Sequence, residues 1–276
     1  MLESVQYRAS GGQPAVSAEL RIDNDRDATL FAGTSWSVPP HVLDRVGRFA
    51  DRVTDDEWAG IQQAVDDGDL TRVRIDEPDT SPDPATRAVI LTHADGETRL
   101  TVSGAHPPTA VLEERLLSLM GRLVAQHPQA TVAASMRFDA ADGTITPHVT
   151  LAHAGTEPLA LLLFSDDDPT YFVRLTFVFE RSLDTAAGEQ IWLPAGSATV
   201  ARDDVAQLVE RAGIPTGVHE MLPGSAYEVT APPIPVPDSP DVLAVRTRIE
   251  FWYPDGDTAR TRLQLELPRQ PLEHAR

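Results

Sequence analysis

Cysteine and lysine are both absent from this chain of 276 residues. Without cysteine there is no disulfide framework, no thiolate metal site and no cysteine nucleophile. Without lysine there is neither a Schiff-base lysine nor a phosphate-binding lysine. Long apolar runs are also missing: residues 159–164 form one of the longest, far short of the roughly 20 residues that a membrane helix needs. We therefore expect a cytoplasmic protein with no membrane contact.

Positive charge is scarce. The chain has 42 acidic and 23 basic residues, which gives a formal net charge of −19. Such a chain repels phosphate backbones, so nucleic-acid binding is disfavoured. Two interpretations of the acidity stay open: it keeps the protein in solution, or an acidic face meets a partner protein with a basic surface.

The length predicts two domains, because an ordinary domain has roughly 150 residues. Residues 1–128 have the pattern of an α+β domain. Apolar residues alternate at Val5 and Tyr7, as in a strand, and a capping box starts a helix at Thr54, with Glu57 three residues later. A second amphipathic helix is predicted over residues 109–126, and Leu70 to Ile75 alternates as a further strand.

Residues 129–276 have many short alternating segments separated by turn residues. This pattern is typical of a β-sandwich. One short helix interrupts it, with Val205, Leu208 and Val209 on one face and Gly213 as its stop. The predicted fold is therefore an α+β domain followed by an all-β immunoglobulin-like sandwich with a short inserted helix.

Two stretches of the second half, "TITPHVTLAHAGTEPLALLLF" and "MLPGSAYEV", resemble the immunoglobulin-like sandwiches of bacterial accessory proteins and of intracellular proteinase inhibitors. The pair Ile191-Trp192 belongs to the same likeness. The first half is similar to emfourin-like inhibitors of metalloproteases in its "YRASGG" turn, its acidic helix cap, its "ADGET" strand pair and its leucine-rich last helix. It departs from that pattern over residues 29–52 and 77–84, so the resemblance transfers no inhibitory residue.

The stretch DNDRDA places Asp23, Asp25 and Asp27 at alternate positions. A calcium-binding EF-hand loop would need glycine at its sixth position and a carboxylate at its twelfth, where this chain has Ala28 and Thr34. Aspartate and asparagine also favour turns, because their side chains bond to the local backbone. We predict an acidic turn that is available to a basic partner.

Other candidate ligands are also explained without a metal. His148 and His153 are five residues apart, an odd offset that places them on opposite sides of a strand, and both are expected at the surface. The acidic run at residues 166–168 is predicted to be a solvated turn rather than a calcium site. We expect no metal and no cofactor.

Aromatic residues provide the remaining candidates. Trp36 lies in a predicted loop, and Trp252 and Tyr253 lie near the end of a predicted strand. Exposed aromatic side chains often anchor protein interfaces. Together with the three aspartates, these residues are the predicted protein-interaction sites.

No nucleotide-binding loop and no Gly-x-Ser-x-Gly elbow is present in the sequence. The sequence therefore favours a non-enzymatic protein-binding module, an adaptor or accessory subunit of a bacterial complex. Two alternatives stay open: a protease inhibitor, and a hydrolase whose Ser, His and Asp residues are dispersed along the chain.

Overall fold

The computed structural model describes residues 2–12, 16–36, 43–72, 75–76, 85–103, 107–184, 189–238, 242–255 and 259–272. The fold is mostly β, with 56% strand, 18% helix and three helices in these ranges. Among them, no helix has the length and apolar character needed to cross a membrane. The chain separates into two compact units, Met1–Thr131 and Val132–Arg276.

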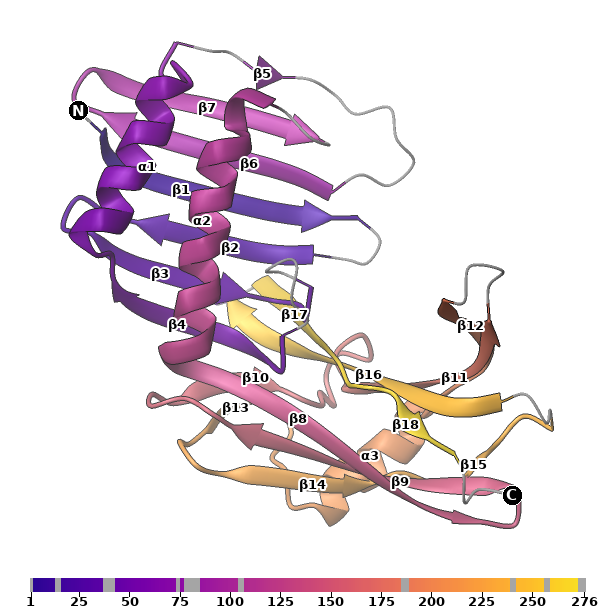
Figure 1. Cartoon of the computed structure of the whole chain (residues 1–276). Helices are drawn as coiled ribbons and strands as arrows, with labels where there is room; N and C mark the ends of the chain where they lie inside the picture. The colour runs from indigo at the N-terminus through magenta and orange to yellow at the C-terminus, as the bar shows by residue number, and fades with distance from the viewer. Residues whose placement is uncertain are drawn as a thin grey trace. The chain divides into compact units, whose positions relative to one another are not determined.

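The first unit is a sheet with two helices on one face (Figure 1). Its strand order is β4-β3-β2-β1-β6-β7-β5, and β5 is parallel to its neighbour β7 while the other neighbours are antiparallel. The elements are β1 (Leu2–Gly11), β2 (Val16–Ile22), β3 (Asp27–Ala32), β4 (Arg45–Arg52), α1 (Asp55–Asp67), β5 (Ile75–Asp76), β6 (Ala85–His93), β7 (Gly96–Ser103) and α2 (Pro107–Gln126).

The core of this unit lies between the sheet and its helices. Val5, Tyr7 and Leu20 point to the helical side and are at most 3% exposed. The capping box predicted at Thr54 is confirmed, with both reciprocal hydrogen bonds present. It starts α1 so that Trp58 and Ile61 are buried. The sheet and the helices therefore follow the alternation and the stripes of the sequence.

The strand predicted from Leu70 to Ile75 is wrong for its first residues. Residues 69–72 form a turn, Ile75 and Asp76 are in a strand, and residues 73–74 lie outside the described residues. Leu70 is fully buried, and its backbone N–H donates to the Val65 carbonyl at 3.0 Å. One apolar residue anchored against the end of α1 therefore explains part of the pattern that suggested a strand.

The second unit consists of two β-sheets and a short helix. In one sheet the order is β14-β9-β8, with β15 also paired with β9; in the other it is β12-β11-β16-β10-β13, with β17 and β18 also paired with β16. Residues 128–131 of β8 belong to the first unit. The elements are β8 (Pro128–Ala141), β9 (Thr144–His153), β10 (Leu159–Leu162), β11 (Arg174–Asp184), β12 (Gln190–Thr199), α3 (Arg202–Arg211), β13 (Val218–Met221), β14 (Ala226–Thr230), β15 (Ile234–Pro235), β16 (Val242–Asp255), β17 (Ala259–Glu266) and β18 (Gln270–Pro271).

The core of this unit is formed by strands in which every second side chain is buried. Every second residue of β9 is buried, and Phe177 and Phe179 of β11 are at most 1% exposed. A hydrogen bond from Thr247 of β16 to the Met136 sulfur of β8, 2.8 Å long, joins the two sheets. The short helix predicted from residue 203 is confirmed as α3, and its three predicted apolar residues are buried.

Candidate functional site

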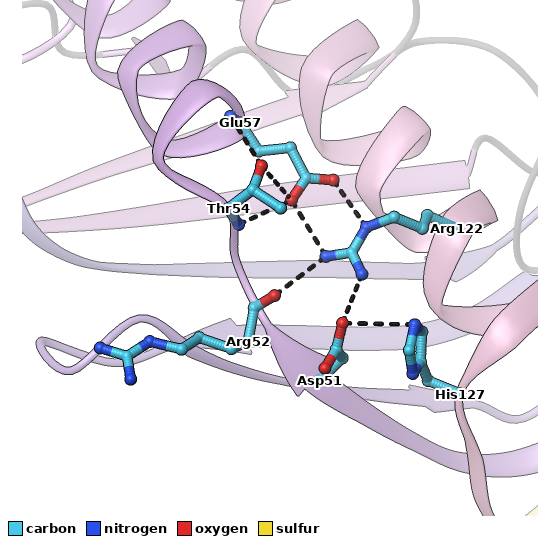
Figure 2. Close-up of polar contacts among 6 residues, drawn as sticks. All are labelled: Asp51, Arg52, Thr54, Glu57, Arg122 and His127. Atoms are coloured by element: carbon cyan, nitrogen blue, oxygen red, sulfur yellow. Dashed lines mark hydrogen bonds and ion pairs between the residues drawn. The ribbon is translucent and has the colours of Figure 1, made fainter.

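Arg122 of α2 is at the centre of a polar cluster in the first unit (Figure 2). Its Nε and Nη2 atoms donate to the two carboxylate oxygens of Glu57 at 2.7 and 3.0 Å. Its Nη1 atom donates to Asp51 Oδ2 at 2.5 Å, and His127 Nε2 lies 3.3 Å from the same oxygen. One guanidinium therefore joins the start of α1, the end of β4 and the last turns of α2.

The electrostatics of this cluster favour a structural role. Burial alone would raise the pKa of Asp51 and of Glu57, but hydrogen bonds from Arg122 and from backbone N–H groups hold both pKa values below their ordinary range. The hydrogen bond to Glu57 in turn raises the pKa of Arg122. Carboxylates held in this way are poor proton acceptors at neutral pH. The cluster is therefore a junction between elements.

These pKa directions predict acid sensitivity of the first unit. In the unfolded chain Asp and Glu titrate near about 3.9 and 4.3. Because the folded pKa values of Asp51 and Glu57 are lower, their stabilisation is complete above about pH 5 and is lost as the pH falls through the folded pKa values. We expect the melting temperature of the Asp51→Asn/Glu57→Gln double variant to fall less between pH 6 and pH 3 than that of the wild type. An equal fall in calorimetry would contradict this.

A hollow of about 430 Å³ lies elsewhere in the first unit, between the end of α1 and the turn that joins β6 to β7. Its His93 Nε2 lies 3.1 Å from Thr98 Oγ1, and that hydroxyl donates to the Thr71 carbonyl. The polar groups of His93 and Thr98 are thus used locally. Its other charged residues, Asp66, Asp95 and Glu97, are all acidic, and within the described residues no three His, Asp or Glu side chains converge as metal ligands would.

A groove of about 610 Å³ in the second unit is the stronger candidate site. One wall is α3, which contributes Asp204, Gln207 and Arg211 at i, i+3 and i+7, so these side chains share a face. The other wall is β14 with the Pro232-Pro233 segment that follows it. Between the walls, Leu208 and Val229 are about 5–6% exposed and supply apolar surface. Its volume is in the range of ligand-binding clefts.

Three residues of β14 direct their backbone N–H and C=O groups away from β9, and no backbone partner for these groups is found in the described part of the chain. Two bonds to β9 flank the strand: His153 N–H donates to the Ser225 carbonyl at 2.9 Å, and Ala231 N–H donates to the Pro147 carbonyl at 2.8 Å. Bonding direction alternates along an antiparallel strand. The N–H and C=O groups of the residues between them, Ala226, Glu228 and Thr230, therefore point away from β9. Within the described residues, β14 pairs with β9 alone.

The charges in the groove are unbalanced. Asp204 and Glu228 are acidic and Arg211 is basic. Arg211 Nη2 donates to Gln207 Oε1 at 3.2 Å, one turn away on α3. Glu228 pairs with Arg137 at 3.0 Å, but both side chains are more than half exposed, so this pair is weak and exchangeable. The groove offers carboxylates to a basic side chain.

Asp23 and Asp25 of DNDRDA lie in the turn between β2 and β3, as predicted, and Asp27 is the first residue of β3. Asp23 Oδ1 accepts hydrogen bonds from the backbone N–H groups of Asp25 and Asp27, at 3.0 and 2.9 Å. Arg26 has a φ of +66°, and its guanidinium pairs with Asp55 at the start of α1. All three aspartates are exposed. A contact with a basic partner stays a prediction.

The predicted aromatic sites are neither fully exposed nor fully buried. Trp36, Trp252 and Tyr253 are all half-buried, and Trp252 packs edge-on against Tyr171 with ring centroids 5.1 Å apart. Trp36 belongs to the first unit and the other two residues to the second. Their role in protein contacts stays a prediction.

The histidine prediction is partly wrong. His148 and His153 do point to opposite sides of β9, but His153 is a core residue with 5% exposure. Its Nδ1 atom accepts a hydrogen bond from Gly155 N–H at 3.0 Å. This ring nitrogen therefore has a partner although the ring is buried at the end of β9. The acidic run near Asp168 is a turn, as predicted, with Thr170 N–H donating to Asp168 Oδ1 at 2.8 Å.

The residues of the groove were missed at the level of sequence. The spacing of Asp204, Gln207 and Arg211 is visible in the chain, but it resembles any solvated helix face. Nothing in the local pattern near Glu228 shows that β14 ends its sheet. The chain matches no protein-family model, and no curated protein is significantly similar to it in sequence.

Proposed function

We propose that this chain is a non-enzymatic protein-binding module, an adaptor or accessory subunit that takes an extended segment of a partner protein into the groove between α3 and β14. The observation that carries the proposal is the outward-facing backbone of Ala226, Glu228 and Thr230 beside the polar face of α3. A free strand edge next to a helix offers backbone hydrogen bonds for affinity and side-chain contacts for specificity.

The charges of the groove define the partner segment. Asp204 and Glu228 outnumber Arg211, and the whole chain carries a net charge of −19. A segment with arginine or lysine is therefore attracted both at long range and in the groove. Its alternate side chains point to opposite sides of the added strand, so apolar residues between the basic ones would meet Leu208 and Val229.

A proline substitution tests the backbone contribution directly. Glu228→Pro removes an outward-facing N–H and leaves the bonds to β9 intact, since proline is tolerated at a free strand edge. Glu228→Thr removes the same carboxylate but keeps the N–H. We expect a fluorescent octapeptide of alternating arginine and valine to bind the threonine variant at least tenfold more tightly than the proline variant in an anisotropy titration.

The control is the same octapeptide with N-methyl groups on every second amide, which blocks pairing along one edge without changing its charge. Two such peptides, methylated on either set of amides, should differ in affinity because only one edge faces β14. Equal binding of both methylated peptides and the parent would overturn the proposal, and so would equal binding by the two Glu228 variants. Circular dichroism of both variants verifies the fold.

We also propose that the second unit is an immunoglobulin-like sandwich. Two antiparallel sheets that share one core, joined by the contact between Thr247 and Met136, support this class. Protease inhibition and hydrolysis by a dispersed Ser, His and Asp site stay predictions from the sequence.

A further inference from the structure

On the face of the first unit's sheet that is opposite α1 and α2, two neighbouring rows carry arginine, while the row beside them holds Asp27 and Glu97 together with Arg52. Register places six side chains of this face in one row across β4, β3, β2, β1, β6 and β7. The members of the row are Ala50, Thr29, Arg21, Gln6, Ile90 and Arg99. At about 4.8 Å between strands, such a row is about 24 Å wide.

The neighbouring row on the same face has the same character. In each of the same six strands, its member lies two residues away from the member of the first row. Its members are Arg48, Phe31, Glu19, Arg8, Ala88 and Thr101. The two rows together, named here the arginine face, hold four arginines and one glutamate in a chain whose net charge is −19. These two rows are therefore more basic than the chain as a whole.

The single carboxylate of the arginine face is already satisfied. Glu19 accepts hydrogen bonds from Gln6 Nε2 at 2.8 Å and from Arg8 Nη2 at 3.3 Å, and it also pairs with Arg21. The side chains of Arg8 and Arg21 are nevertheless 48% and 65% exposed, and Arg99 is exposed as well. Glu19 thus orders two guanidinium groups and leaves excess positive charge at the surface.

We infer that the arginine face binds an acidic segment of a partner polypeptide. Guanidinium groups match carboxylates with two parallel hydrogen bonds, and several of them on a flat sheet fit a short run of Asp or Glu. This surface is separate from the groove of α3 and β14, so it does not depend on the proposed function.

Single-stranded nucleic acid fits this face less well. Surfaces that bind it stack successive bases on several aromatic rings, whereas Phe31 is the only aromatic residue in the two rows and is half-buried. A polyanion longer than about 24 Å would also run past the arginine face and along a protein that is acidic overall. A short acidic peptide stays within the face.

The test uses the full chain and a fluorescent peptide of six glutamates, which spans about 20 Å when extended. We expect saturable binding at 50 mM NaCl that weakens at 200 mM, because the contacts are ionic. Arg21→Gln/Arg99→Gln should weaken binding about fivefold or more. The matched control is Arg72→Gln/Arg115→Gln, which removes the same charge from exposed arginines of the same unit that lie outside the two rows, and it should change affinity less than twofold.

Three results would overturn the inference. They are an absence of glutamate-peptide binding, an equal loss of affinity in the control variant, and tighter binding of a thymidine hexanucleotide than of the peptide. The last result would assign the arginine face to nucleic acid instead. Melting curves of both double variants show whether the sheet is intact.

Discussion

Gly47→Ala is expected to lower the free energy of unfolding of the first unit by about 4 kcal/mol. Gly47 of β4 has a φ of +127°, and an added Cβ atom would lie 2.3 Å from the Ala130 carbonyl oxygen and 2.9 Å from Thr131 Cα. The unfavourable backbone conformation costs about 1–3 kcal/mol. The contact costs a similar amount, because both neighbours are backbone atoms and no side chain is able to rotate away.

Urea unfolding followed by hydrogen exchange at the amides of β4 would measure this loss within the first unit. The matched control is Gly121→Ala in α2, where an added Cβ atom meets nothing within 4 Å. That substitution should stabilise the unit by about 0.5–1 kcal/mol through helix propensity. A decrease in the free energy of unfolding of less than about 1 kcal/mol for Gly47→Ala would be smaller than the backbone strain alone. It would show that β4 shifts away from residues 130–131 at little cost.

Arg122→Ala is expected to lower the free energy of unfolding of the first unit by about 2–3 kcal/mol. The change leaves Glu57 and Asp51 without their shared partner, and these carboxylates are only 26% and 33% exposed. Removing one member of a buried pair costs about 3–5 kcal/mol. Contact with water screens the charges here, which lowers the estimate. Arg122→Lys should recover part of the loss, because lysine keeps the charge but not the paired hydrogen bonds.

Arg115→Ala is the control for this prediction, since Arg115 is an exposed residue of the same helix. Its effect should stay within about 0.5 kcal/mol. The same urea and hydrogen-exchange measurement separates the two variants. If Arg122→Ala and Arg115→Ala destabilise the unit equally, the cluster in Figure 2 is a surface contact and not a junction.

Local patterns predicted most of the elements because their causes lie within a few residues. The capping box joins Thr54 to Glu57, three residues apart. The strand prediction from Leu70 failed for the opposite reason, since Leu70 is buried against the end of α1. His153 was misplaced in the same way, because burial at a strand end depends on what covers it.

The candidate sites depend on residues that only folding brings together. Arg122 is 71 residues from Asp51, and the arginine face collects residues from six strands. The groove is lined by α3 and β14, which are separated in sequence by β13. The outward direction of Glu228 follows from its register with β9.

Local sequence sets the turn at Asp23 and the start of α1, because their hydrogen bonds join residues two to four positions apart. It also sets the alternation of the strands, because successive side chains of a strand point to opposite faces. The tertiary structure alone decided which strand ends a sheet within the described ranges and which charges share a face. Strand order and register depend on packing between distant segments, and residues near one another in sequence do not specify that packing.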